Sequence, residues 1–283
     1  MKKKNIKVYT ADYIILSIVF VICIFPIVYT VLTSFKTNAE ILAQPDRLLP
    51  AVWSFDNYRL AFMSGEFNFG KMLFNSAYYT LICVCFSILA SSVCAYVFER
   101  GDFTGKKIIF TVFSSLMFIS LGSITVYPLF DILNIVHLNR SLWGLIVIKM
   151  LGIPIVNIYL VKSYIKTLPK ELDEAAEIDG CSFTGIFFRI IAPLLKPIVA
   201  TVAILAFQSS WNEYLMPTIF TISNPAQRTL MVGVVALKSS GNSAASWNLM
   251  LAGSTVALIP VLLAYMFLNR YFVSGLTAGA VKG

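Results

Sequence analysis

The chain has 283 residues, of which 58% are hydrophobic and only 13% are charged, and its formal net charge is +8. Soluble domains contain about 25% charged residues, so this composition excludes a soluble enzyme with a water-facing surface. The 22 Phe and 13 Tyr residues also exclude a disordered chain, and much of the protein is therefore expected to face lipid.

Six apolar stretches predict transmembrane helices, since a helix needs about 20 apolar residues to cross the hydrocarbon core of a membrane. The first lies between Asp12 and Lys36, in an N-terminal region, residues 1–70, with a cytoplasmic tail before it and an outer loop after it. A membrane domain, residues 71–272, is expected to hold the other five, at about 72–97, 108–130, 142–161, 198–220 and 250–272. A short cytoplasmic tail, residues 273–283, follows. The expected fold class is all-α and integral to the membrane.

The basic residues predict how these helices are oriented, because Lys and Arg are enriched in loops that stay in the cytoplasm. Most of them lie near the N-terminus, between the second and third spans, in the loop of about 162–197, and after the sixth span. Six spans place these four regions on one side, so both termini are predicted to be cytoplasmic. The positive net charge follows from this topology, and nucleic acid is not expected as a partner.

The loop of residues 162–197 has a helical pattern of its own. Thr167 is predicted to cap a short acidic helix, and Gly180 is predicted to end it. Ser182 is predicted to cap a second helix, which is amphipathic because apolar residues recur in it at helical spacing; these residues are Phe183, Ile186, Phe187 and Ile190. The loop therefore predicts a rigid element with a hinge and an apolar anchor.

The spacing of this loop resembles the EAA loop of ABC-importer permeases. The matching residues are Glu174, Ala175, Ala176, Gly180, Ile190 and Pro193, while Ala192 stands where the family pattern has Leu. Residues 34–36, 55–58, 211–214 and 275–283 resemble the carbohydrate branch of that family, specifically its maltose-type second permease. The likeness covers essentially the whole chain.

This resemblance implies a type-I ABC importer permease fold with six transmembrane helices, in a bacterial-type cytoplasmic membrane. It implies as partners a homologous second permease subunit, two ATP-binding subunits and an extracytoplasmic sugar-binding protein. It also implies that the loop couples to the ATPase through Glu174, Ala175, Ala176, Asp179, Gly180 and Phe183. The chain has no G-x-x-x-x-G-K-[ST] phosphate loop, so we expect no enzyme activity and no cofactor in it, with ATP and Mg used by the partner ATPase.

Two charged residues are predicted to lie inside the membrane, where ionisable side chains are costly and therefore candidates for function. Lys149 and Glu213 are expected at similar depth from the outer face, paired with each other or facing a cavity. Gln208, Trp211 and Asn212 lie close to Glu213 in sequence, and amides beside an aromatic ring suit a sugar. These five residues are the predicted substrate pathway. The alternatives are that Lys149 extends to the membrane surface and that the two amides bridge helices.

The sequence-based prediction is thus a sugar permease of an ATP-driven importer that works by alternating access. One alternative is an ion-coupled secondary transporter, although such a protein predicts a second, inverted half. Another is the same permease role for a non-sugar solute such as a glycerol phosphate. A metal site is not expected, because the chain has one His and its five Cys lack metal-binding spacing.

Overall fold

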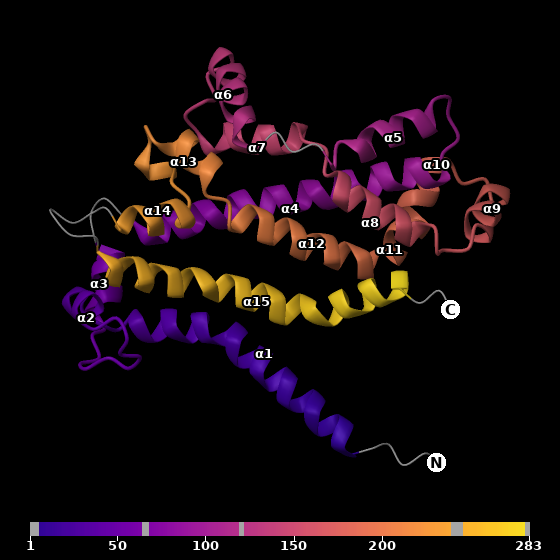
Figure 1. The fold of residues 1–283 in the computed structure, drawn as a ribbon. Helices are drawn as coiled ribbons and strands as arrows, with labels where there is room; N and C mark the ends of the chain where they lie inside the picture. Colours follow the sequence, from indigo (N-terminus) through magenta and orange to yellow (C-terminus); the bar gives the residue numbers. More distant parts are fainter. Residues whose placement is uncertain (1–5, 64–67, 119–121, 239–245, 281–283) are drawn as a thin grey trace. The chain divides into compact units, whose positions relative to one another are not determined.

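The structure is a computed structural model that describes residues 6–63, 68–118, 122–238 and 246–280, and within these ranges it is helical and contains no strand (Figure 1). The α-helices are α1 (Ile6–Thr33), α2 (Asn38–Ala43), α3 (Asp56–Met63), α4 (Phe69–Arg100), α5 (Lys106–Ser115), α6 (Val126–Ile135), α7 (Leu142–Leu151), α8 (Ile155–Ile165), α9 (Glu171–Ile178), α10 (Phe183–Ile186), α11 (Ala192–Leu194), α12 (Lys196–Trp211), α13 (Leu215–Thr221), α14 (Leu230–Leu237) and α15 (Trp247–Ala280). Two 3₁₀ turns, η1 (Gly122–Thr125) and η3 (Pro225–Gln227), and a π-helical turn, η2 (Phe187–Ile191), link some of them.

Three helices are long and apolar enough to cross a membrane: Asp12–Thr33 within α1, α4, and Trp247–Phe267 within α15. Two bent helix pairs raise the number to five if each pair is one span. The bend is 45° between α7 and α8, and 79° between the segment Phe183–Leu194 and α12. The predicted span at 108–130 falls on α5, η1 and α6, with residues 119–121 outside the described ranges. The all-α class is confirmed, and the sixth span remains a prediction.

Two predicted spans are interrupted, and a proline explains each interruption. Proline has no N–H to donate, and its ring clashes with the carbonyl of the residue four positions earlier. Pro154 caps α8 directly after the break that ends α7. Pro217 lies in the first turn of α13, four residues after Glu213, which lies in the break after α12. The break after α7 follows Lys149 within one turn, so both charges that were predicted to lie inside the membrane lie at helix interruptions.

The chain forms two compact units. The first comprises the described residues of Met1–Gly70 and Gly233–Ile259, and the second those of Lys71–Val232 and Pro260–Gly283. In the first unit, the side chains of residues 12–28 on α1 are exposed, as expected for a helix that faces lipid or another subunit.

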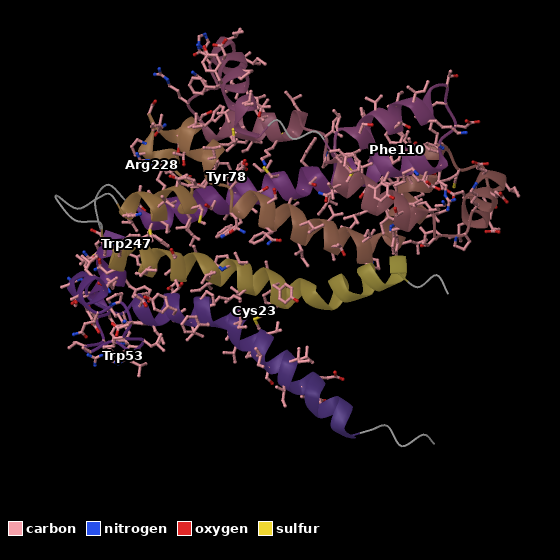
Figure 2. The ribbon with its side chains drawn as sticks, viewed as in Figure 1. Cys23, Trp53, Tyr78, Phe110, Arg228 and Trp247 are labelled. Atoms are coloured by element: carbon pink, nitrogen blue, oxygen red, sulfur yellow. The ribbon has the colours of Figure 1, made fainter. Side chains whose placement is uncertain are left out.

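The loop that follows α1 in the first unit is folded around Asn57. Its side-chain amide donates hydrogen bonds to the carbonyls of Ser34 (2.7 Å) and Lys36 (2.8 Å), and its oxygen accepts one from Asn248 (2.7 Å). The ring of Phe35 packs against the rings of Trp53, Phe55 and Tyr58; Figure 2 labels Trp53. The segments 34–36 and 55–58, far apart in sequence, therefore form one structure.

The second unit is built along α4, and two apolar clusters contact opposite ends of this helix. Tyr79 and Cys83 pack against residues of α7 in the first cluster. Tyr96 and Phe98 belong to the second cluster, together with residues of α8, α9, α10 and α12. Figure 1 shows α9 at one end of α4 and α13 at the other. α4 thus has one cluster in contact with α9 and another in contact with α7.

The prediction that Thr167 caps the acidic helix is wrong. α9 begins at Glu171, its N-cap is Lys170, and this cap makes no side-chain hydrogen bond. The hydroxyl of Thr167 instead donates to the carbonyl of Tyr164 (2.7 Å) in the last turn of α8. The last carbonyls of a helix have no partner within the helix. The Thr167 hydroxyl therefore bonds to a carbonyl at the end of α8, and not to an N–H at the start of α9.

Candidate functional site

The end of α9 and the start of α10 are formed as the sequence predicts. Gly180 has φ of 80°, a left-handed conformation that glycine adopts without steric cost. Its N–H donates to the carbonyl of Glu177 (3.0 Å), and the N–H of Cys181 donates to that of Ala176 (2.9 Å), which is a Schellman ending. Ser182 then caps α10 by accepting a hydrogen bond from the N–H of Gly185 (3.2 Å).

The two faces of α9 differ sharply in exposure. Asp173 and Ala176 are buried against the rest of the second unit. Glu174 and Ala175 are exposed on the other face, and Ile178 leaves 87% of its surface exposed there. The exposed face of α9 thus combines an acid, a small residue and an apolar side chain.

The remaining predicted coupling residues lie around the turn after α9. Asp179 is the C-cap of α9, and both Asp179 and Gly180 are exposed. Phe183 opens α10, and its ring centroid lies 4.6 Å from that of Tyr96 on α4. The structure therefore brings all six predicted residues into one turn-and-helix element, and it attaches that element to α4.

The attachment depends on three polar side chains to which the sequence analysis gave no such role. Arg100, the last residue of α4, forms an ion pair with Asp173 (Nε to Oδ2, 3.1 Å), and it donates to the carbonyl of Leu168 (2.7 Å). The hydroxyl of Tyr96 lies 3.4 Å from both Asp173 Oδ1 and the carbonyl of Phe183. No local sequence pattern indicated this contact, because Arg100 and Asp173 lie on helices far apart in sequence and meet only through packing.

A cavity of about 510 Å³ lies towards the other end of α4. Its volume is in the range of about 300–1,000 Å³ that small-molecule sites occupy. Side chains from α4, α7, α8, α12 and α13, and from the two helix breaks, line it. Most of the lining is apolar, and its hydrogen-bonding groups include Ser87 and Asn157, which bond to each other (2.8 Å).

Lys149 and Glu213 both line this cavity and form an ion pair across it (Nζ to Oε2, 3.1 Å). Tyr79 on α4 donates its hydroxyl hydrogen bond to the same Glu213 oxygen (2.6 Å). The side chains of Lys149 and Glu213 are 32% and 16% exposed. The cavity therefore carries a polar cluster of no net charge that joins both interrupted spans to α4.

The other three residues of the predicted pathway do not line the cavity. Gln208 and Asn212 are exposed. Trp211 is buried, and its ring stacks on that of Phe207 at a centroid distance of 5.4 Å. The sequence analysis missed Tyr79, Ser87 and Asn157, because single polar residues on apolar helices offered little signal. Within the described ranges, no group of three or more His, Cys, Asp or Glu side chains is placed to hold a metal ion.

Comparison with protein families identifies a match over nearly the whole chain. Residues 10–278 match the family model described as "Binding-protein-dependent transport system inner membrane component". The matched segment includes most of α1, the residues that line the cavity, and α9.

Two relatives from Bacillus subtilis (strain 168) are similar over their full lengths. The arabinooligosaccharides transport system permease protein AraQ is 35% identical over 277 residues, covering 97% of this chain and 95% of the relative. The galactooligosaccharides transport system permease protein GanQ is 34% identical over 273 residues, covering 96% of this chain and 95% of the relative.

Among solved structures, a chain of a bacterial ABC transporter involved in the import of the acidic polysaccharide alginate has a similar fold. The TM-score is 0.78, and the match covers 96% of this chain and 99% of that chain at 22% sequence identity. This likeness confirms the type-I ABC permease fold.

Proposed function

The chain belongs to the family of binding-protein-dependent transport system inner membrane components, and from this premise we propose that it is the permease subunit of an ATP-driven sugar importer. The sugar is an oligosaccharide or a related carbohydrate, as the names of the full-length relatives suggest. The protein is a multi-pass membrane component and not an enzyme. Its role is to move the sugar across the cytoplasmic membrane by alternating access.

The observation that carries the proposal is the two-faced helix α9. Its buried face ties it to α4, and its exposed face offers Glu174, Ala175 and Ile178 to a partner. The exposed side chains combine an acid with apolar surface, which suits a cleft with a basic rim. We propose that each of two ATP-binding subunits docks on such a helix, one from this chain and one from a homologous second permease, and that these subunits use the ATP and Mg.

The cavity is the proposed part of the sugar pathway in this chain. Its apolar walls suit the C–H faces of a sugar, and the polar groups of Lys149, Glu213 and Asn157 suit hydroxyl groups. Because Lys149 and Glu213 neutralise each other, the cavity favours a neutral sugar over an anion. This arrangement argues against the glycerol phosphate alternative, which needs an excess of positive charge.

The proposed membrane orientation follows from the basic residues. With six spans and both termini in the cytoplasm, α9 lies on the cytoplasmic side, where ATP-binding subunits are found. The loop around Asn57 then lies outside, on the side of a sugar-binding protein. Part of the last outer loop, residues 239–245, lies outside the described ranges.

The proposal is tested by uptake into vesicles that contain the chain, its partner permease and both ATP-binding subunits. With the binding protein outside, labelled arabinotriose and galactotriose serve as probes. We expect uptake of at least one sugar that requires ATP inside the vesicles. Reversing the charge of Glu174 (Glu174→Lys) is expected to abolish it, while Glu177→Lys, an exposed position nearer the buried face of α9, retains it. Uptake by the chain alone without ATP would instead show a secondary transporter.

A further inference from the structure

Helix α4 contacts α9 through Arg100 and reaches the cavity through Tyr79, and docking of an ATP-binding subunit on α9 does not by itself require both contacts. We propose that Arg100 and Asp173 are positioning residues for energy coupling: their buried ion pair makes α9 an extension of α4, so that a displacement of α9 moves α4 with it. This inference rests on the proposed function, because a helix driven by an ATPase is the element whose movement has to be transmitted.

Arg100 contacts the chain both before and after the first residue of α9. Its guanidinium pairs with Asp173 in the first turn and donates to the carbonyl of Leu168 in the segment that leads into the helix. A longer contact of 3.4 Å joins it to the carbonyl of Ile165, the last residue of α8. A planar guanidinium has five donors in a fixed geometry, which lets one side chain fix several groups at once.

The ion pair between Arg100 and Asp173 is buried. The side chains of Arg100 and Asp173 are only 6% and 13% exposed, so water cannot readily replace either partner. Tyr96 extends the contact, because its hydroxyl lies 3.4 Å from Asp173 Oδ1 and from the carbonyl of Phe183. Its ring also packs on the rings of Phe183 and Phe187. α4 therefore contacts the chain before, within and after α9.

Tyr79 lies on α4, the same helix as Tyr96 and Arg100. Its hydroxyl bonds to Glu213 at the cavity. A rise of 1.5 Å per residue places Tyr79 and Tyr96 roughly 25 Å apart along α4. A single helix thus connects the element proposed to receive the ATPase with the polar cluster in the cavity, as Figure 1 shows for the course of α4 between α9 and α13.

A neighbouring ion pair provides a matched control. Glu99, next to Arg100, pairs with Lys162 on α8 at 2.9 Å, with side chains 14% and 24% exposed. Lys162 also lies 4.6 Å from the ring centroid of Phe110, which Figure 2 labels on α5. This pair joins α4 to α8 and does not involve α9. Removing it disturbs the same end of α4 without releasing α9.

The test measures sugar taken up per ATP hydrolysed by the full complex in vesicles, with the labelled arabinotriose or galactotriose that the wild-type complex transports. For Asp173→Asn we expect assembly of the complex and continued ATP hydrolysis, but about a tenfold fall in uptake per ATP. Asp173→Glu keeps the carboxylate and is expected to restore the ratio to within about threefold of wild type. Glu99→Gln is expected to change the ratio by less than about twofold, because the Glu99–Lys162 pair joins α4 to α8 and not to α9.

An unchanged ratio in Asp173→Asn, or an equal fall in Glu99→Gln, would overturn the inference. If Asp173→Asn does not assemble, Tyr96→Phe decides, since it removes only the hydroxyl group. A fall of about threefold in uptake per ATP supports the inference, and an unchanged ratio overturns it. Absence of ATP-dependent uptake in the wild-type complex would instead contradict the proposed function.

Discussion

Two of the ion pairs in the second unit have the same length and different surroundings. Arg100 and Asp173 meet at 3.1 Å beside α9, and Lys149 and Glu213 meet at 3.1 Å in the cavity. The first pair is almost fully buried and has additional backbone partners. Lys149 in the second is about one-third exposed and lies against open volume. Distance alone therefore does not indicate what an ion pair does.

Burial separates the two roles. Removing one partner of a buried pair leaves an uncompensated charge and costs about 3–5 kcal/mol. A pair that water can reach contributes less, up to about 1 kcal/mol when it is fully exposed, because water solvates the remaining charge. The pair beside α9 is thus suited to hold two helices together throughout a cycle. The pair in the cavity is suited to exchange its partners for sugar hydroxyl groups at small cost.

The largest expected effect is on stability. Arg100→Met leaves Asp173 buried without its cation and is expected to lower the free energy of unfolding of the second unit by about 3 kcal/mol. Lys149→Met leaves Glu213 bonded to Tyr79 and lining the cavity, where water can reach it, and is expected to lower this free energy by a smaller amount, about 1 kcal/mol. Denaturant or thermal unfolding of the purified protein in detergent measures both. Equal losses in the two variants would remove the distinction between the pairs.

The next effect is on uptake through the cavity. Glu213→Gln removes a charge without changing volume and leaves Lys149 unpaired, so the cavity becomes cationic. We expect uptake of the transported neutral sugar to fall about tenfold, which is about 1.4 kcal/mol in transition-state free energy, while basal ATP hydrolysis stays within about twofold of wild type. The exposed Gln208 lies outside the cavity lining, and Gln208→Ala serves as the control. A larger fall in Gln208→Ala would place the pathway elsewhere.

A smaller effect is expected from changing the turn after α9, and a second glycine variant controls for the loss of stability. Gly180 and Gly122 have φ of 80° and 53°, and a Cβ added to either would meet no atom within 4 Å. Gly180→Ala and Gly122→Ala are therefore each expected to cost about 1 kcal/mol through backbone strain alone. We expect only Gly180→Ala to weaken co-purification with the ATP-binding subunits. Similar losses of the complex in both variants would argue against a special role for the turn after α9.

The smallest effect is expected for the hydrogen bond between α4 and the cavity. Tyr79→Phe removes the hydroxyl that bonds to Glu213 at 2.6 Å. Uptake is expected to fall by about threefold or less, because a second partner, Lys149, still neutralises the carboxylate. Transport assays on the same vesicles measure it. A fall larger than that of Glu213→Gln would show that the tyrosine acts independently of the ion pair.

Features that depend on local chain chemistry were predictable from the sequence. Gly180 ends α9 and Ser182 caps α10, because a left-handed glycine and a capping hydroxyl act on residues within one turn. Thr167 was the exception, since its hydroxyl had two nearby helix ends to serve. The prolines explain the interruption of two spans, although the sequence analysis treated residues 142–161 and 198–220 as single stretches.

Contacts between distant segments were not predictable in the same way. Arg100 and Asp173 are each ordinary in sequence, the first as a basic residue after a span and the second as an acid in the first turn of a helix. Their pairing depends on how α4, α8 and α9 pack, which no local pattern records. Lys149 and Glu213 were expected at similar depth because each lies about seven residues from the outer end of its predicted span. The amides of Gln208 and Asn212 were grouped with them by sequence proximity, but they lie outside the cavity lining.

The central claim is that an ATP-binding subunit docks on the exposed face of α9, and crosslinking tests it most directly. In a variant whose five native cysteines are replaced, Ala175→Cys carries a short photo-crosslinker, and the exposed Gln208→Cys on α12 serves as the control. With the whole complex in membranes, we predict a crosslinked product of this chain and an ATP-binding subunit from position 175 and none from position 208. Crosslinking to the ATP-binding subunit from position 208 and not from 175 would contradict the account.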